Sequence, residues 1–228
     1  MPELSAQPHE AELSAAVQDY AKAIYLAGAE GRRSVSTTML AARLNVRPAS
    51  VSGMVKKLQA LGLAEHEPYR GVRLTERGTL VALEVVRHHR LLELYLVESL
   101  GMTWDEVHAE AEVLEHFLSD QLETLIAEKL GNPTLDPHGD PIPAADLTIT
   151  REETRTLADL EPGERATLVR VSDSDPEMLR FLAGIGITPG KKLQLVERQP
   201  FGGPLYVRVG KEKHALGVTL ARAMSVTT

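Results

Sequence analysis

Short helical patterns separated by turn residues fill the first part of the chain. Apolar residues recur at helical spacing over 13–28, and two shorter helices are predicted at 38–44 and 49–61. Ser36 is a suitable N-cap before the first of these two helices. Pro48 lies in the first turn of the second one, where its missing N–H costs no hydrogen bond. The spacing therefore predicts a pair of short helices joined by a tight connection.

A basic hairpin is predicted directly after this helix pair. Residues 63–67 and 71–75 favour two short strands around 68–71, and a further helix follows. A helix pair followed by a basic hairpin is typical of a winged helix-turn-helix domain, which places its second helix in the major groove of DNA. The candidate base and phosphate contacts are Arg47, Ser50, Ser52, Lys56, Lys57, Arg70 and Arg73. The alternative interpretation is a small helical module with a solvated basic face.

Two longer helices are predicted over about 75–100 and 104–130. In the second helix, four polar residues fall within an arc of roughly 100° at ~100° per residue. They are His108, Glu112, Glu115 and His116. The opposite side is apolar and wide enough to pack against other helices or a second subunit. It carries Val113, Leu114, Phe117, Leu118, Leu122, Leu125 and Ile126.

Histidine and carboxylate side chains also project from the first of these two helices. His89 and Glu93 lie four residues apart, which puts both on one face. Imidazole and carboxylate groups that converge from adjacent helices form sites for first-row metals. The sequence therefore predicts metal binding, and the alternative is a solvated acidic face with incidental histidines. It contains no HExxH motif, Ser-His-Asp signature or Gly-rich phosphate loop, so we expect no enzyme.

The period of the apolar residues changes beyond an irregular connector. Residues 132–150 are rich in Pro, Gly and Asp, which predicts a segment without regular structure. The elements predicted after it are strands at 164–171, 192–199 and 204–209, a short helix at 176–183 and a closing segment at 214–222. This arrangement predicts a small SH3-like β-barrel. Three acidic residues, Asp173, Asp175 and Glu177, lie at the start of the short helix, where they cap it or reach a metal on the middle domain.

Three domains follow from these patterns, and the predicted class is mainly α. They are a winged helix-turn-helix domain at 1–76, a helical metal-binding and dimerisation domain at 77–147 with a linker at about 132–154, and an SH3-like domain at 155–228. A composition of 43% hydrophobic and 25% charged residues is that of a globular protein. The absence of cysteine rules out disulfides, thiolate zinc sites and a cysteine nucleophile.

The charge is distributed unevenly along the chain. Residues 32–90 contain 11 basic and 4 acidic residues, a local +7, whereas residues 91–161 contain 3 basic and 17 acidic residues, a local −14. The basic part suits phosphates and the acidic part suits cations. No apolar run approaches the ~18 residues that span a bilayer, and the N-terminus lacks a signal-peptide pattern. We therefore expect a cytoplasmic protein without a membrane partner.

In this order, the motifs resemble those of the diphtheria-toxin-repressor family of metal-dependent transcription regulators. The most similar stretches are 48–52 (PASVS), 87–93 (RHHRLLE) and 107–116 (VHAEAEVLEH). Residues 139–143 (GDPIP) look like the family's Gly-x-Pro-Ile-Pro linker, and 184–190 (GIGITPG) looks like part of its SH3-like, FeoA-type domain. The likeness covers nearly the whole chain.

The resemblance implies a homodimer that binds palindromic double-stranded operator DNA when loaded with metal, as a repressor in metal-ion homeostasis. It implies one regulatory site, formed by Asp19, Glu112, Glu115 and His116. It also implies a second site with the ligands His89, Glu93 and His108. An acidic residue of the third domain completes this second site. Asp175 matches best by position, and Glu177 is the other candidate.

The ligand types make the chain similar to the manganese-responsive branch of this family. Iron-responsive members have Met and Cys at the positions of Asp19 and Glu112, and hard carboxylates suit Mn(II) better than soft sulfur ligands do. Mn(II) is therefore the expected metal, with Fe(II) as the alternative and other divalent metals binding in vitro. The chain differs from short manganese-responsive members by Lys22, where they carry Glu, and by its third domain.

Two rival functions come from other classes of protein. A winged-helix regulator of an organic ligand would need an apolar pocket, and 4% aromatic residues give little to build one. A metal-dependent hydrolase would need an open coordination position and a nearby general base. Neither rival accounts for the ligand cluster and the helix-turn-helix together.

Overall fold

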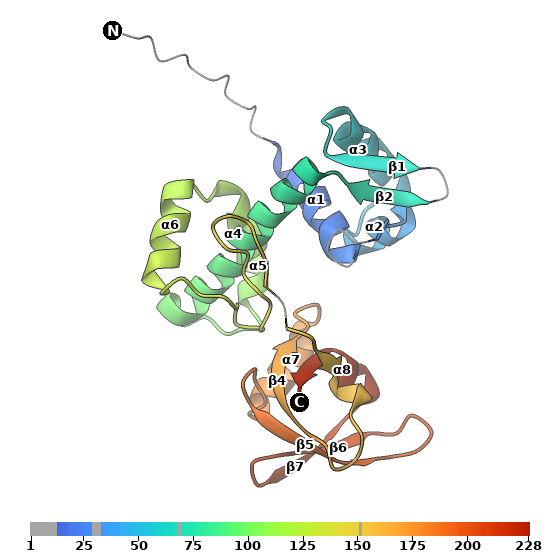
Figure 1. Cartoon of the computed structure of the whole chain (residues 1–228), viewed down its shortest axis with the longest axis vertical. Helices are drawn as coiled ribbons and strands as arrows, with labels where there is room; N and C mark the ends of the chain where they lie inside the picture. The colour runs from blue at the N-terminus through green and yellow to red at the C-terminus, as the bar shows by residue number, and fades with distance from the viewer. Residues whose placement is uncertain (1–12, 29–32, 68–69, 151) are drawn as a thin grey trace. The chain divides into compact units, whose positions relative to one another are not determined.

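The structure is a computed structural model that describes residues 13–28, 33–67, 70–150 and 152–228 (Figure 1). It forms two compact units, Met1–Val86 and Arg87–Thr228, whose boundary falls inside one long helix. Each unit is described by itself. Within the described residues, none of the helices combines the length and the apolar character that a bilayer crossing requires.

The N-terminal unit contains the predicted helix pair and hairpin. Its elements are α1 (Ala15–Ala27), α2 (Thr37–Arg43), α3 (Pro48–Ala60), β1 (Ala64–Glu67), β2 (Gly71–Leu74) and the first turns of α4 (Glu76–Leu100). The predicted helices are confirmed, with α2 and α3 each beginning and ending one residue earlier than expected. Antiparallel β1 and β2 form the hairpin, and an isolated bridge joins Val35 to Val72.

Capping and burial explain why this segment folds as a helix pair. The Ser36 side chain accepts a hydrogen bond from the Met39 amide at 3.1 Å, which fixes the start of α2. Pro48 occupies the first turn of α3, as predicted. The fully buried side chains that hold the helices together include Ile24, Leu40, Val51 and Leu58. The polar face of α3 is thereby turned outward.

The second helix predicted in the middle segment is wrong beyond residue 114. The structure has α5 (Val107–Leu114), a 3-10 turn (Glu115–Phe117) and a separate helix α6 (Asp120–Lys129). Leu118 is extended, and the Ser119 side chain accepts from the Leu122 amide at 3.3 Å. Ser119 therefore starts a new helix, and the acidic residues of its first turn suit the positive end of that helix.

The connector is irregular, as predicted, but it is tightly ordered around one turn. The Asp136 side chain accepts from the amides of His138 at 2.8 Å and Asp140 at 2.9 Å. Gly139 has a φ of +88°, and a Cβ there would lie 1.9 Å from the carbonyl oxygen of Val169. Only glycine allows this approach, so the turn packs directly against the strand that contains Val169.

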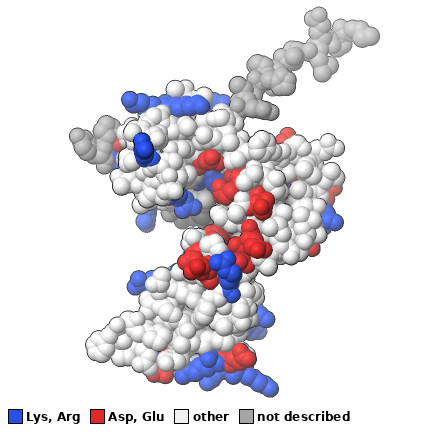
Figure 2. All heavy atoms as spheres, turned by 180° about the vertical axis from the view of Figure 1, so that it is seen from behind, with Lys and Arg blue, Asp and Glu red and all other residues white. Residues whose placement is uncertain are grey.

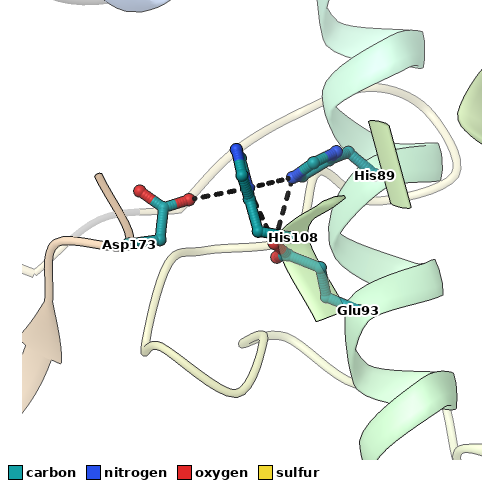
Figure 3. Close-up of side chains that lie close together, drawn as sticks. All are labelled: His89, Glu93, His108 and Asp173. Carbon is teal, nitrogen blue, oxygen red and sulfur yellow. Dashed lines mark hydrogen bonds and ion pairs between the residues drawn. The ribbon is translucent and has the colours of Figure 1, made fainter. Parts of the chain in front are cut away.

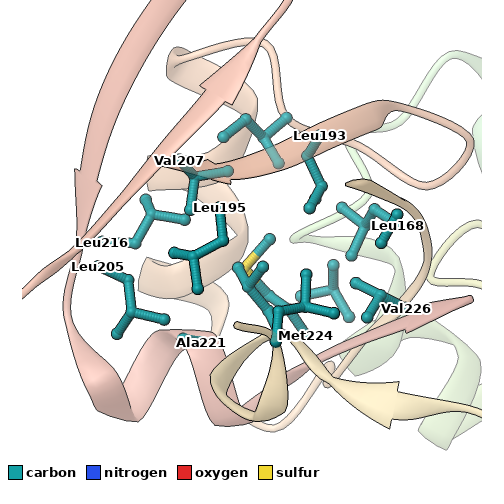
Figure 4. Close-up of a cluster of buried hydrophobic side chains, with 14 of the residues drawn as sticks. Leu168, Leu193, Leu195, Leu205, Val207, Leu216, Ala221, Met224 and Val226 are labelled. Atoms are coloured by element: carbon teal, nitrogen blue, oxygen red, sulfur yellow. The ribbon is translucent and has the colours of Figure 1, made fainter. Parts of the chain in front are cut away.

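The third domain is a single antiparallel sheet of six strands, in the order β3-β8-β4-β5-β6-β7. Its elements are β3 (Arg155–Thr156), β4 (Arg165–Val171), α7 (Pro176–Gly184), β5 (Lys192–Arg198), β6 (Leu205–Val209), β7 (Glu212–Leu216), α8 (Val218–Arg222) and β8 (Met224–Thr227). Buried leucines and valines from these elements meet in one core (Figure 4). The predicted class of mainly α thus describes the chain as far as α6, whereas the third domain is mainly β. The expected closing segment is the end of β7 followed by α8.

Candidate metal centre

Two helices and one loop of the second unit bring four potential metal ligands together (Figure 3). This group, here called the α4 cluster, consists of His89 and Glu93 of α4, His108 of α5 and Asp173 of the β4–α7 loop. The Nε2 atom of His89 lies 3.0 Å from Glu93 Oε1 and 3.1 Å from His108 Nδ1. His108 Nδ1 in turn lies 3.2 Å from Glu93 Oε1 and 3.4 Å from Asp173 Oδ2. One ligand atom from each residue lies within 4.8 Å of the others.

The predicted i, i+4 pair on α4 is confirmed, and Glu93 lies at the centre of the cluster. Its side chain is fully buried. Burial by itself would raise the pKa of Glu93, but the charge of His89 and the contacts with His108 and His138 hold this pKa well below its usual range. Glu93 therefore stays an ionised carboxylate, which is the form that binds a cation.

A second group, here called the turn cluster, consists of Glu112, Glu115 and His116. Glu112 lies in the last turn of α5, whereas Glu115 and His116 lie on the 3-10 turn that follows. The predicted helical arc therefore includes Glu112 but does not extend to Glu115 and His116. Glu115 is buried, and its Oε1 lies 3.6 Å from His116 Nε2. Its Oε2 lies 2.5 Å from His89 Nδ1, and Glu112 Oε1 lies 3.7 Å from the same nitrogen. The structure thus places the turn cluster directly beside the α4 cluster.

Hydrogen bonds from α4 and α6 hold the 3-10 turn in place. His88 Nδ1 lies 3.1 Å from the carbonyl oxygen of Glu115, and because a carbonyl only accepts, this nitrogen is the donor. His88 Nε2 lies 3.0 Å from Glu123 of α6. Arg87 also binds Glu123 and donates to the Pro143 carbonyl at 2.6 Å. Glu123 therefore holds His88 in position against the turn, and through Arg87 it is also linked to the connector.

The connector contributes two residues that the sequence analysis missed, Asp136 and His138. His138 Nδ1 lies 3.6 Å from Glu93 Oε2, and both atoms are buried without a hydrogen-bond partner among the residues that the structure describes. The other nitrogen of His138 donates to the Trp104 carbonyl at 2.7 Å. Glu93, Asp136 and His138 also offer ligand atoms within 4.8 Å of one another. The Asp-x-His spacing in residues 136–138 was the available signal, but only the folded connector brings it to α4.

The protonation of this group depends on its buried charges. Burial alone would lower the pKa of His138, but contact with Glu93 and the charge of Asp136 raise it to about 9. Burial and the charges of Asp140 and Glu93 raise the pKa of Asp136 to about 8, against the opposing charges of His138 and Arg90. Protons thus compensate buried carboxylates here, and a divalent cation could replace them.

The predicted third-domain ligands lie in different places. Asp175 is the N-cap of α7, and its Oδ1 accepts from the Glu177 amide at 2.9 Å, so the capping role considered for this segment is confirmed. Asp173 is the acidic residue that the structure brings to His108, and Asp175 and Glu177 are not in this cluster. Asp19 lies on α1 in the N-terminal unit, so its predicted role as a ligand stays a prediction.

The candidate DNA-contacting residues are all exposed on α3 and the hairpin. Gly53 lies next to Ser52 on α3, and a Cβ at this position would meet nothing within 4 Å, so this part of the helix surface is open. Within the residues that the structure describes, Lys56 and Lys57 have no carboxylate within ion-pair distance. Arg70 pairs with Glu67 at 3.1 Å and Arg73 with Glu65 at 2.8 Å, and both pairs are well exposed. These exposed ion pairs are weak enough to exchange for phosphate.

Most of the predicted apolar dimer face is exposed. Phe117 is 82% exposed, and Val113, Leu114, Leu122 and Leu125 are also exposed. Ile126 is buried in the domain's own core, so it was wrongly placed on the face, whereas Leu118 is partly buried against that core. Acidic side chains gather over the middle of the face shown in Figure 2, in keeping with the negative charge of residues 91–161.

Comparison with known proteins covers almost the whole chain. Three family profiles match: "Iron dependent repressor, N-terminal DNA binding domain" at 12–72, "Iron dependent repressor, metal binding and dimerisation domain" at 75–144, and "FeoA domain" at 155–228. The iron-dependent repressor IdeR of Mycobacterium tuberculosis (strain ATCC 25618 / H37Rv) is 32% identical over 94% of this chain and 98% of its own length. The diphtheria toxin repressor of Corynebacterium efficiens is 31% identical over 70% of this chain and 74% of its own.

Solved structures give the same result. A manganese-dependent transcriptional repressor in complex with manganese has a TM-score of 0.87 and 43% identity, and the match covers 93% of this chain and 99% of that one. The manganese regulator SloR has a TM-score of 0.75 and 31% identity, with coverage of 92% and 97%. The fold and the order of domains are therefore shared with both iron- and manganese-dependent proteins.

Proposed function

This chain belongs to the family of iron-dependent repressors, and from that premise we propose that it is a Mn(II)-dependent repressor that binds a palindromic operator as a dimer. The matched profiles and relatives are transcriptional regulators and not enzymes, so the hydrolase alternative has no support. The observation that supports the proposal is that the α4 cluster and the turn cluster, two groups of potential metal ligands, lie next to each other. The cytoplasm, where operator DNA lies, is the proposed location.

The residues present fit a hard divalent cation. The donors of both clusters are carboxylate oxygens and imidazole nitrogens, and the chain has no cysteine to supply a softer ligand. Oxygen-rich donor sets suit Mn(II), whereas sulfur favours softer ions. Glu93 Oε2 and His138 Nδ1, which have no hydrogen-bond partner among the described residues, are two further atoms that can ligate a cation, and this supports the proposal. Fe(II) is the second candidate, because the relative IdeR is an iron-dependent repressor and its sequence is 32% identical to that of this chain.

We propose two metal sites with separate ligand sets. Glu112, Glu115 and His116 of the turn cluster, joined by Asp19 of the N-terminal unit, form the regulatory site. The α4 cluster forms the other, with Asp173 as the ligand from the third domain in place of Asp175 or Glu177. Asp136 and His138 add an oxygen and a nitrogen next to Glu93.

The switch follows from the charges of the regulatory site. Asp19, Glu112 and Glu115 are three carboxylates, which repel one another when brought together without a cation. A divalent ion supplies the positive charge that offsets this repulsion. Metal therefore favours the state in which Asp19 joins the turn cluster, and it shifts the population only as far as it prefers that state.

The proposed dimer explains the need for a palindrome. The exposed apolar side chains around Phe117, Leu122 and Leu125 give a two-fold interface, and a symmetric dimer presents two copies of α3. Half-sites roughly one helical turn apart would then be contacted by the two recognition helices. Sedimentation as a monomer in the presence of metal and operator would contradict this arrangement.

The direct test is operator binding measured by fluorescence anisotropy against a series of divalent metals at controlled free concentration. We expect tight, metal-dependent binding with Mn(II). Zn(II), which nitrogen and oxygen ligands bind more tightly, should give a smaller maximal operator affinity, because selectivity depends on coordination geometry and not on metal affinity alone. Equal operator affinity in chelator and in every metal would refute metal-dependent repression. A larger maximal operator affinity with Fe(II) than with Mn(II) would assign the protein to the second candidate.

A further inference from the structure

One face of the third-domain sheet carries an ordered group of polar and basic side chains. Arg165 of β4 pairs with Gln194 of β5, which pairs with Arg208 of β6, so these three residues form one cross-strand row. Thr167 of β4 pairs with Lys192 of β5, and this second row lies two residues along each strand. Since alternate residues share a face, both rows lie on the same side of the sheet.

This face is hollowed into a pocket of about 420 Å³. All five of these residues line it, and Gly210 lines it without a side chain. A volume in this range suits a small ligand. None of the lining residues belongs to the α4 cluster, the turn cluster or the DNA-contacting candidates.

The three cations of the pocket differ in their partners from four other cations of the domain. Arg155, Arg170, Arg180 and Lys213 each pair with a carboxylate. Over the described part of the chain, Arg165, Lys192 and Arg208 have no carboxylate at ion-pair distance. Arg208 Nη1 donates to Gln194 Oε1 at 3.5 Å. The pocket therefore holds three positive charges that no side-chain carboxylate of the described residues compensates, and Thr227 and Thr228 line it as well.

Uncompensated like charges on adjacent strands repel and destabilise a sheet. The two arginines lie two strands apart, or about 10 Å at the backbone, which long side chains can bridge around one anion. Guanidinium groups match phosphate with paired hydrogen bonds, and a lysine adds a point charge. Gln194 is held in place because its Nε2 donates to the Gly163 carbonyl at 3.1 Å.

We propose that this pocket is a phosphate-binding site of the third domain, separate from the metal-dependent switch. Two sources share the required chemistry: a small phosphate compound and the phosphate backbone of DNA. The pocket recognises the phosphate group in either case. Binding depends on Arg165 and Arg208 together, with Lys192 adding charge.

The test uses the full-length, metal-free protein, so that phosphate does not associate with bound metal. Calorimetric titration with inorganic phosphate and with pyrophosphate, at constant ionic strength, is compared between the wild type and the double variant Arg165→Gln/Arg208→Gln. We expect saturable binding to the wild type and a loss of about tenfold or more in the variant, because two charge-assisted contacts are removed. In parallel, binding of a non-operator duplex is measured as a function of salt.

Two controls make the result specific to the pocket. Arg222→Gln removes one exposed cation of the same domain outside the pocket, and it should leave phosphate binding unchanged. Arg165→Lys/Arg208→Lys keeps the charge and should retain part of the affinity. Thermal unfolding of each variant is compared with the wild type, so that a loss of fold is not taken for a loss of ligand.

The two arms identify the source of the phosphate. Saturable phosphate binding that is lost only in the double glutamine variant supports a small-molecule site. If free phosphate does not bind but the variant lowers the salt slope for duplex DNA by about 2, the backbone of DNA is the source. No phosphate binding together with an unchanged slope, or an equal loss in Arg222→Gln, overturns the proposal and leaves a solvated basic face.

Discussion

The α4 cluster and the turn cluster contain the same kinds of side chain, but the chain positions them in different ways. Every member of the α4 cluster belongs to one compact unit, and Glu93 at its centre is fully buried. The turn cluster lies at the end of α5 and on a 3-10 turn, and its proposed fourth ligand, Asp19, belongs to the other unit. A preformed site suits constant occupancy, whereas a site that needs both units suits a switch. Similar ligands can thus form a permanently occupied site in the α4 cluster and a regulatory site in the turn cluster.

The largest effect is expected from breaking the turn cluster. His116→Ala removes a nitrogen ligand whose side chain is only 9% exposed, so thermal unfolding is compared with the wild type to show that the variant keeps its fold. Operator affinity in Mn(II) should fall by about 10- to 100-fold, towards the metal-free value, because the coupling between metal and DNA is lost. Anisotropy measured with and without metal checks this, and His66→Ala on the hairpin is a control that should keep a full metal response.

A pH effect on stability should distinguish the buried group around Glu93 from the turn cluster. The folded-state pKa values of His138, about 9, and Asp136, about 8, both lie above their ordinary values of 6.5 and 3.8. The folded state therefore binds more protons than the unfolded state, and the stability linked to His138 is complete below about pH 6.5. The free energy of unfolding of the metal-free protein should fall by roughly 1–3 kcal/mol between pH 6.5 and 9.

Urea unfolding in chelator at several pH values measures this dependence. Asp136→Asn keeps an oxygen that can accept from the His138 and Asp140 amides, so it should flatten the pH dependence without removing the turn. A wild-type stability that stays constant or rises over this pH range would contradict the proton-sharing arrangement.

A smaller effect should identify the third-domain ligand of the α4 cluster. Asp173→Asn removes the charge that lies 3.4 Å from His108. The affinity of the α4 cluster for Mn(II) should therefore fall by about tenfold. Asp175→Asn is the matched control, because asparagine is also a good N-cap and the metal affinity should not change. Calorimetric titration compares the two variants, and a loss in Asp175→Asn alone would show that the ligand had been misassigned.

The smallest effect concerns the support of the turn. Glu123→Gln weakens the hold on His88, which contacts the turn that carries Glu115. Supporting partners of ligands tune affinity by about 10-fold or somewhat more, and a neutral glutamine that keeps one hydrogen bond should cost less, about threefold. Mn(II) affinity of the turn cluster should fall while that of the α4 cluster stays unchanged. Equal losses at both clusters would indicate general loosening of the domain.

Local signals predicted much of the fold. Ser36 and Pro48 marked the helix pair, and the i, i+4 spacing of His89 and Glu93 placed both side chains in one cluster. The break before α6 was missed because Phe117, Leu118, Leu122 and Leu125 continue a helical apolar period across it. Ser119 followed by acidic residues was the local sign of a new helix, and the longer apolar pattern concealed it.

The features that could not be predicted depend on contacts between distant segments. Strands β3 and β8 are two and four residues long, and they are defined by pairing with each other and with β4. Asp136 and His138 reach Glu93 only because the connector folds back, and Gly139 allows its close approach to Val169. The position of Asp173 in the sequence made it a candidate ligand. Only the path of the loop after β4 shows that Asp173, and not Asp175, lies next to His108.

The central claim is that metal at the turn cluster, and not at the α4 cluster, controls DNA binding. The most direct test follows bound Mn(II) by electron paramagnetic resonance and operator binding by anisotropy in the same samples, for wild type, His116→Ala and Asp173→Asn. We predict that Asp173→Asn loses Mn(II) from the α4 cluster but keeps an operator response. His116→Ala is a cleaner partner variant than Glu115→Gln, because Glu115 also contacts His89 of the α4 cluster, and it should retain that ion and lose the response. An operator response that disappears in Asp173→Asn and persists in His116→Ala would contradict the account.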